Sequence, residues 1–288
     1  MALKMTLGYS PCPNDTFIFY ALAHGKVVAP HISFDFNVAD VEELNQMALQ
    51  SGPQSGPHND LRGGLDISKI SFHAFGRVRD AYRLLRCGGA LGRGCGPLVV
   101  SREQIGMEDL RPGKNSDKTP RIAVPGRLTT AWLLLLLYDP GLAQSAVFMP
   151  FHKIMDAVAT GKVDAGLIIH EARFTYASHG LGEVLDLGAW WERETGLPIP
   201  LGAIAAKKSL SDDVITEVED AVKRSILYAR QHGRECMPYI RSLAQELSDD
   251  VINAHIDLYV NDFTLDIGRE GGRAIDTLFE RAAACGVF

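Results

Sequence analysis

Short apolar runs alternate with longer helical segments along this chain, which is the pattern of an α/β protein. Residues 4–9 alternate between polar and apolar positions and predict a strand, and the apolar residues 17–22 predict a helix after a Pro-rich turn. A mostly helical region is expected at 211–285, with Asp212 and Asp249 as N-terminal caps. The same reasoning predicts strands at 32–38, 66–71, 98–101, 121–124, 147–149, 165–169, 184–187 and 197–205, and helices at 41–49, 72–85, 131–138 and 154–159.

The order of these elements predicts two lobes. The polar residues 102–119 separate two series of βα units, and the strand at 197–205 returns the chain to the first series. We therefore expect a discontinuous lobe 1, made of residues 1–103 and 201–288, and a lobe 2 made of residues 104–200. This is the layout of a two-lobe binding-protein fold, in which ligands lie in a cleft between lobes, on strand ends and helix N-termini.

The predicted strand at 165–169 ends in His170 and Glu171, which makes this strand end a candidate site. Open α/β sheets bind ligands at the carboxyl ends of their strands. A histidine there can be neutral near pH 7 and accept a proton. Taken alone, a single histidine more often just hydrogen-bonds a neighbouring loop.

Two further strand ends run into helix N-termini, which suit anions because unpaired N–H groups face the turn. In the first, at residues 10–16, Asn14 or Asp15 is well placed to cap the next helix, and simple capping explains these residues equally well. In the second, Thr129 and Thr130 precede an apolar helix. They fit a carboxylate or phosphate site, and they also fit a single capping threonine.

Two glycine-containing segments are expected to be loops. Residues 88–97 are rich in glycine but precede a strand and lack the GxGxxG spacing, so they do not predict a nucleotide site. A surface loop is expected at 51–64, where Ser-Gly-Pro occurs twice. The pair Trp190-Trp191 could offer an aromatic surface to a flat ligand, although such pairs are more often packed in the interior.

The composition narrows the classes of function. A formal net charge of -6 argues against a nucleic-acid partner. The apolar run at 131–138 is too short to span a bilayer, and residues 1–10 contain no apolar stretch of signal-peptide length, so we expect a cytoplasmic protein without membrane partners. The five cysteines are widely spaced, contain no CxxC pair and fit reduced thiols rather than disulfides or a zinc site.

The chain as a whole resembles a known enzyme family. The residues that carry the resemblance are Ser10–Phe17, Gly88–Gly94, Pro125–Ala131, Gly166–Tyr176 and Asp186–Glu192. It is similar to the 1,4-dihydroxy-6-naphthoate synthases of the futalosine route to menaquinone, and only the segment 51–64 is longer than the family pattern. The resemblance implies a periplasmic-binding-protein-like type II fold used without export.

The resemblance also implies a reaction and a set of site residues. The reaction is the lyase cleavage of cyclic dehypoxanthine futalosine to 1,4-dihydroxy-6-naphthoate and a three-carbon fragment, with no metal or organic cofactor. His170 would be the general base, and Ser71, Thr130, Ala131 and Asn45 would line the pocket for a small-molecule carboxylate. The N-terminus at Thr129 and Thr130 would hold the substrate carboxylate or a sugar-derived hydroxyl.

Two other functions share the same expected fold. A plain solute-binding protein would need export and no catalytic base. A chorismate dehydratase of the same pathway also takes a carboxylate substrate, so anion sites alone do not separate it from the naphthoate synthase. The motifs around His170 and at Trp190-Trp191 favour the naphthoate synthase. The sequence does not determine the oligomeric state.

Overall fold

The computed structural model describes residues 2–50, 64–113, 119–244 and 247–288, so the expected loop at 51–64 lies outside the described residues except for Gly64. The chain forms two compact units. Unit 1 comprises Met1–Leu91 and Leu201–Gly272, and unit 2 comprises Gly92–Pro200 and Arg273–Phe288. Compared with the expected lobes, residues 92–103 and 273–288 lie in the second unit instead of the first. The division into two lobes that move separately stays a prediction.

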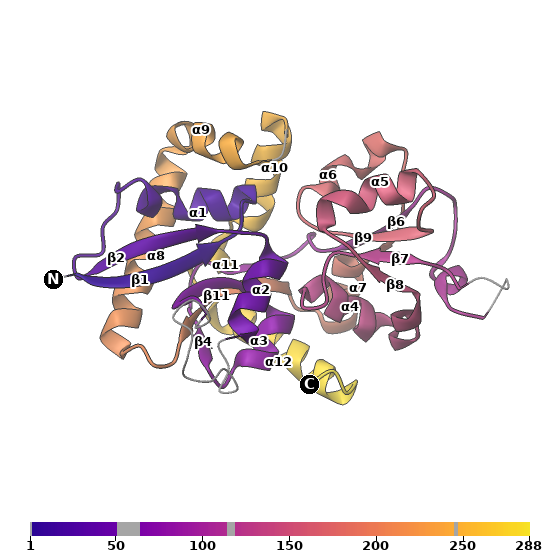
Figure 1. The fold of residues 1–288 in the computed structure, drawn as a ribbon, viewed down its shortest axis with the longest axis horizontal. Helices are drawn as coiled ribbons and strands as arrows, with labels where there is room; N and C mark the ends of the chain where they lie inside the picture. The colour runs from indigo at the N-terminus through magenta and orange to yellow at the C-terminus, as the bar shows by residue number, and fades with distance from the viewer. Residues whose placement is uncertain (1, 51–63, 114–118, 245–246) are drawn as a thin grey trace. The chain divides into compact units, whose positions relative to one another are not determined.

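Unit 1 contains a mixed sheet with helices on both faces (Figure 1). Its strand order is β2-β1-β3-β11-β4, and β5 also pairs with β11. The elements are β1 (Leu3–Tyr9), α1 (Pro13–Ala23), β2 (Ile32–Val38), α2 (Val41–Leu49), β3 (Ile67–Ser71), α3 (Phe72–Val78), β4 (Tyr82–Leu84), β5 (Ala90–Gly92), β11 (Ile199–Lys207), α8 (Asp212–Gln231), α9 (Gly233–Leu243), α10 (Asp249–Tyr259) and α11 (Asp262–Leu265). Helix α12 (Gly268–Ala284) begins in unit 1 and belongs to unit 2 from Arg273 onward.

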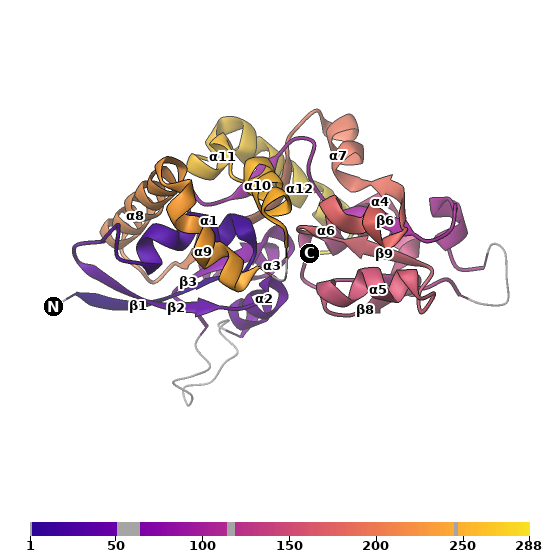
Figure 2. The ribbon, with the colours of Figure 1, turned by 90° about the horizontal axis from the view of Figure 1, so that it is seen from above.

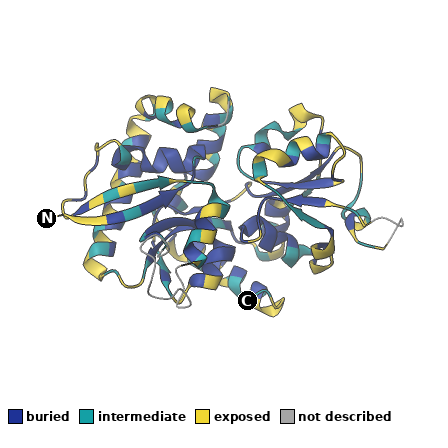
Figure 3. Cartoon of the chain, in the orientation of Figure 1, coloured by how far each residue is buried: buried dark blue, intermediate teal, exposed yellow. Residues whose placement is uncertain are grey.

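Side chains of alternate residues on β1 point to opposite faces of the sheet, and each face is covered by different helices. Met5, Leu7 and Tyr9 of β1 point into a buried core shared with α1, α8, α9 and α10. Gly8 faces the other way, because a Cβ built on it would lie 2.8 Å from Leu44 of α2. Buried positions accordingly concentrate along β1, β3 and α1 (Figure 3).

Unit 2 contains a second mixed sheet, in the order β10-β6-β9-β7-β8. Helices α5 and α6 lie over one face of this sheet, and α4 and α7 lie over the other (Figures 1 and 2). The elements are β6 (Leu98–Ser101), β7 (Ile122–Val124), α4 (Thr130–Tyr138), β8 (Ala146–Phe148), α5 (Ile154–Ala159), β9 (Ala165–Ile168), α6 (Ala172–Thr175), β10 (Gly182–Asp186) and α7 (Leu187–Thr195), with 3₁₀ helices η1 (Met107–Leu110), η2 (Pro140–Ser145), η3 (Phe151–Lys153) and η4 (Tyr176–His179).

Close packing in unit 2 depends on small residues. Gly166 of β9 lies under α5, where an added Cβ would meet Ile154 at 2.5 Å and Val158 at 2.8 Å. Gly188 of α7 approaches the backbone of Cys95 so closely that an added Cβ would lie 1.8 Å from its carbonyl oxygen. None of the helices in the described part of the chain combines the length and apolar character that a bilayer crossing requires.

Most predicted elements are confirmed, and every predicted strand lies within two residues of its expected bounds. The helix expected at 72–85 is wrong beyond Val78, because 82–84 form β4, which pairs with β11. The expected caps Asp212 and Asp249 are also wrong. They occupy first helical positions, while the preceding Ser211 and Ser248 accept the capping hydrogen bonds.

Candidate functional site

Three parallel strands of unit 2 end at the same edge of its sheet. β7 pairs in parallel with both β8 and β9, so the segments that follow their carboxyl ends lie close to one another. These segments carry His170 after β9, Phe151 after β8 and the start of α4 after β7. The strand-end site expected from the sequence therefore contains three neighbouring chain segments.

His170 has an unusual backbone conformation at this edge. Its φ of 58° is left-handed, and among the described residues it is the only positive φ outside glycine. A side chain in this conformation is strained, and such strain persists only where surrounding contacts hold it, most often at functional sites. One such contact is the Phe151 ring, which meets the imidazole edge-on with the centroids 5.1 Å apart.

The start of α4 supplies the second part of this edge. The Thr129 hydroxyl accepts a hydrogen bond from Trp132 N at 3.2 Å and so caps the helix. Thr130 and Ala131 occupy the first turn, and each is 3% exposed. The first-turn N–H groups of a helix point out of its end and favour an anion there. Thr129 thus caps the helix, and substrate binding by Thr129, Thr130 and Ala131 stays a prediction.

An ion pair that the sequence did not indicate braces the turn after His170. Arg173 of α6 donates to Asp186 Oδ2 at 2.6 Å and to the carbonyl oxygen of Gly96 at 3.1 Å. The other oxygen of Asp186 accepts from Gly188 N and Ala189 N and thereby caps α7. Arg173 therefore links the turn that carries His170 to α7 and to the segment before β6.

In unit 1, two of the expected site residues contact each other directly. The Asn45 amide nitrogen donates to Ser71 Oγ at 3.0 Å, and Ser71 N donates to Asn45 Oδ1 at 2.9 Å. Asn45 lies on α2 with no exposed surface, and Ser71 ends β3 with 5% of its surface exposed. This reciprocal pair fixes Ser71 at the carboxyl end of a parallel strand, where ligands of α/β folds bind.

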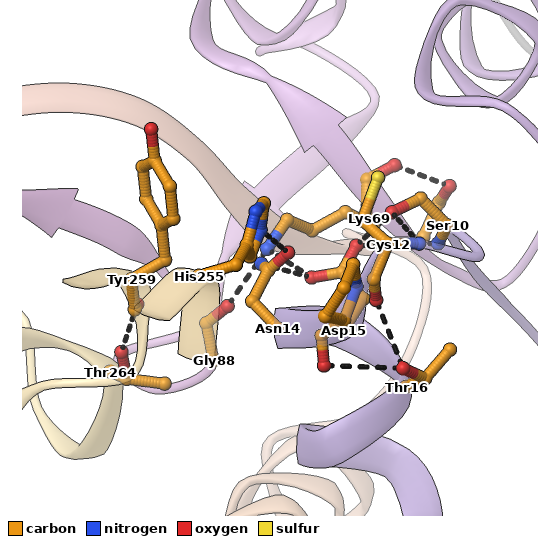
Figure 4. Close-up of polar contacts among 12 residues, drawn as sticks. Ser10, Cys12, Asn14, Asp15, Thr16, Lys69, Gly88, His255, Tyr259 and Thr264 are labelled. Atoms are coloured by element: carbon orange, nitrogen blue, oxygen red, sulfur yellow. Dashed lines mark hydrogen bonds and ion pairs between the residues drawn. The ribbon is translucent and has the colours of Figure 1, made fainter. Parts of the chain in front are cut away.

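The turn after β1 does not use the cap that the sequence suggested. Helix α1 begins at Pro13, its N-cap is Cys12, and no side chain provides the capping hydrogen bond. Asp15 instead accepts from Ser10 Oγ at 2.7 Å and from Lys69 Nζ at 2.7 Å (Figure 4). The sequence indicates only that a lysine, Lys69, lies in the otherwise uncharged segment 67–71 and needs a partner if it is buried; it does not indicate which residue that partner is.

Trp191 packs inside unit 2. It has no exposed surface, and its indole nitrogen donates to the Pro198 carbonyl at 3.0 Å. Trp190 is 8% exposed and meets Tyr138 edge-on. Of the two interpretations of this tryptophan pair, packing in the interior is therefore confirmed, rather than an aromatic surface for a ligand. Within the described ranges, no three His, Cys, Asp or Glu side chains are grouped as metal ligands would be.

The expected site residues thus fall into two groups. His170, Thr129, Thr130 and Ala131 belong to the strand-end edge of unit 2. Asn45 and Ser71 belong to unit 1. The contacts of each group were not visible in the sequence, because Phe151, Arg173 and Lys69 reach their partners across the fold.

A family model described as menaquinone biosynthesis matches residues 5–284 of the chain. The chain belongs to this family. It is 50% identical over 284 residues to a 1,4-dihydroxy-6-naphthoate synthase of Thermus thermophilus, covering 98% of this chain and 95% of the relative. It is 48% identical over 288 residues to the synthase of the same name from Streptomyces coelicolor, with 98% and 94% covered. The resemblance read from the sequence and the expectation of an enzyme are confirmed.

Solved structures confirm the fold class. A crystal structure of an Archaeoglobus fulgidus protein is similar with a TM-score of 0.88 and 35% identity, covering 99% of this chain and 98% of that one. A Candida albicans protein with the generic periplasmic-binding-protein fold is similar with a TM-score of 0.64 and 17% identity, covering 99% and 90%. This member of a biosynthetic family thus has a periplasmic-binding-protein-like α/β fold.

Proposed function

We propose that the chain cleaves cyclic dehypoxanthine futalosine to 1,4-dihydroxy-6-naphthoate and a three-carbon fragment, with His170 as the general base. The observation that carries this proposal is the left-handed conformation of His170 at the end of β9, beside the N-terminus of α4. The two curated relatives named for the naphthoate product support the choice of reaction.

The proposed chemistry needs a proton acceptor. Neutral His170 takes a proton from the substrate, and electrons move toward an aromatic bicyclic product, whose formation helps drive the cleavage. The ring of Phe151 and the Arg173–Asp186 ion pair hold the imidazole turn in position. This preorganisation lowers the cost of reaching the reactive geometry.

The substrate carboxylate is proposed to bind at the first turn of α4. Thr130 is proposed to offer its hydroxyl there, and Thr130 and Ala131 their backbone N–H groups, with the favourable end of the helix dipole. Asn45 and Ser71 of unit 1 are also proposed to be substrate-binding residues, through their polar side chains. The protein is further proposed to act in the cytoplasm, which agrees with five free cysteines.

A paired assay tests the proposal. Purified protein is incubated with cyclic dehypoxanthine futalosine and, separately, with chorismate, and the aromatic product is followed by liquid chromatography and mass spectrometry. We expect 1,4-dihydroxy-6-naphthoate from the first substrate and no dehydration of the second. Dehydration of chorismate would assign the companion reaction of the pathway. Binding of either compound without turnover would assign a carboxylate-binding protein.

A further inference from the structure

A buried ion pair lies in unit 1, and the proposed reaction does not use it. Asp15 is 1% exposed and Lys69 is 5% exposed, and Lys69 Nζ lies 2.7 Å from Asp15 Oδ1 (Figure 4). The second carboxylate oxygen accepts from the hydroxyl and the backbone N–H of Ser10. Lys69 also donates to the carbonyl oxygen of Gly88 at 3.3 Å. Both charges are thus hydrogen-bonded as well as paired.

The hydrogen bonds continue from Asp15 to a buried histidine on α10. The Asn14 amide nitrogen donates to Asp15 Oδ1 at 2.9 Å, which leaves Asn14 Oδ1 to accept from His255 Nε2 at 3.0 Å. His255 is 1% exposed, so this bond assigns the proton to Nε2. The network therefore fixes the turn at 10–14 between β3 and α10.

Stability alone does not account for such a pair. Removing two charges from water costs about as much as their attraction returns, and well-packed apolar replacements of buried pairs are often neutral or stabilising. The surrounding core of unit 1 is apolar, and it already joins β1 and β3 to α1 and α10. A buried pair at this position is better explained by the geometry that it imposes.

That geometry concerns the strand end that carries Ser71. Lys69 and Ser71 are two residues apart on β3, and Ser71 pairs with Gly202 of β11. The stem of Lys69 passes close to Gly202, since a Cβ there would lie 3.6 Å from Lys69 Cε. Because β1 and β3 are parallel neighbours, the turn at 10–14 lies at the same edge of the sheet as Ser71.

We propose that Asp15 and Lys69 are positioning residues for Ser71 and Asn45, the proposed substrate-binding residues of unit 1. Their ion pair locks the end of β3 to the turn at 10–14 and thereby sets where the Ser71 and Asn45 groups point. The pair touches no reacting atom and takes no part in proton transfer. This inference rests on the proposed function, in which Asn45 and Ser71 bind the substrate.

The decisive variant removes both charges together. Asp15→Asn keeps the shape of the side chain and, through its one oxygen, the bond from Ser10, while the bond from Asn14 is lost. Lys69→Met keeps the length of the stem. A single change would leave one buried charge without its partner and is expected to disrupt folding. In the double variant Asp15→Asn/Lys69→Met we expect a melting temperature near that of the wild type. Its KM should rise about tenfold, as for one weakened hydrogen bond, while kcat changes less.

The same strand offers a matched control at its other end. Asp66, just before β3, pairs with Lys207 of β11 at 3.2 Å. It accepts from the Thr6 hydroxyl, as Asp15 accepts from Ser10, and Lys207 also donates to the carbonyl oxygen of Gly64. The double variant Asp66→Asn/Lys207→Met removes the same charges at the amino end of β3. It should keep KM within about twofold of the wild type, because that end lies away from the proposed site.

The pH profile of kcat/KM separates positioning from catalysis. A general base loses activity when it is protonated, so the proposed role of His170 predicts an acid limb, and this limb should be unchanged in Asp15→Asn/Lys69→Met. A folded double variant with wild-type KM would overturn the inference and leave the proposed function intact. Equal KM increases in the test and control variants would also overturn it. Absence of wild-type turnover would remove the proposed function and this inference with it.

Discussion

Replacing His170 by asparagine should abolish turnover without unfolding the protein. Asparagine tolerates the left-handed conformation better than most residues, so the φ of 58° adds little new strain in the variant. The variant loses the edge contact with Phe151, and aromatic pairs of this kind contribute about 0.5–1.5 kcal/mol. Since domains are typically stable by roughly 5–15 kcal/mol, nearly all of the variant should remain folded.

The expected effect on the activation barrier is larger than this loss of stability. General base catalysis contributes roughly 10²–10⁴-fold, which corresponds to about 3–5 kcal/mol of barrier. Asparagine cannot accept a proton near neutral pH, so this whole contribution should disappear. The acid limb of the pH profile of kcat/KM should disappear as well. Single-turnover assays report the chemical step, and urea titrations report the folded fraction.

The chain supplies a matched control for this experiment. His152 is exposed and meets the same Phe151 ring edge-on with the centroids 5.8 Å apart. His152→Asn is therefore the same chemical change beside the same ring, and it should leave turnover unchanged. Well-folded His170→Asn that turns over within threefold of His152→Asn would refute the reasoning, and Glu171 would become the candidate base.

Three further predictions follow from the described contacts. Thr129→Val should lower stability by about 0.5–2 kcal/mol in urea titrations through loss of the cap. Thr130→Val should weaken substrate binding by roughly 1–3 kcal/mol, seen in KM, through loss of the proposed hydroxyl contact. Burial raises the pKa of Asp66, but hydrogen bonds, first from Thr6, outweigh this effect and lower the pKa overall. The ionised Asp66 therefore stabilises the fold above pH ~4, and this contribution should be lost as the pH falls through the lowered pKa. The free energy of unfolding of Asp66→Asn should accordingly fall less on acidification than that of the wild type. Only Cys285 is exposed, so one thiol per native chain should react with a disulfide reagent, and all five should react in denaturant.

Local patterns predicted most elements of this fold because strands and helix starts carry local signals. The segment 72–85 shows where such patterns fail. The sequence predicted a single helix there, but 82–84 form a strand that pairs with β11, more than a hundred residues later in the chain. A strand that forms only because a distant partner is present leaves little trace in its own sequence.

In the candidate site, too, some features could be predicted from neighbouring residues and others could not. The position of His170 at a strand end and the helix start at Thr129 could be read from neighbouring residues. The partner of Asp15 could not, because Lys69 lies 54 positions away and local reasoning assigned Asp15 to a helix cap. The left-handed backbone of His170 was equally invisible, since a histidine at a strand end does not by itself indicate a positive φ.

The sheet order of unit 1 has a consequence for synthesis on the ribosome. β3 pairs on one side with β1, but its other partner, β11, ends only at Lys207, after most of unit 2 has been made. At about 5–20 residues per second, translation from Leu91 to Lys207 takes roughly 6–23 s. Throughout that interval β3 has an open backbone edge of the kind that pairs with foreign strands. The nascent chain is therefore expected to need chaperone protection most during this interval, and a slow-translating stretch between the two units would prolong its exposure.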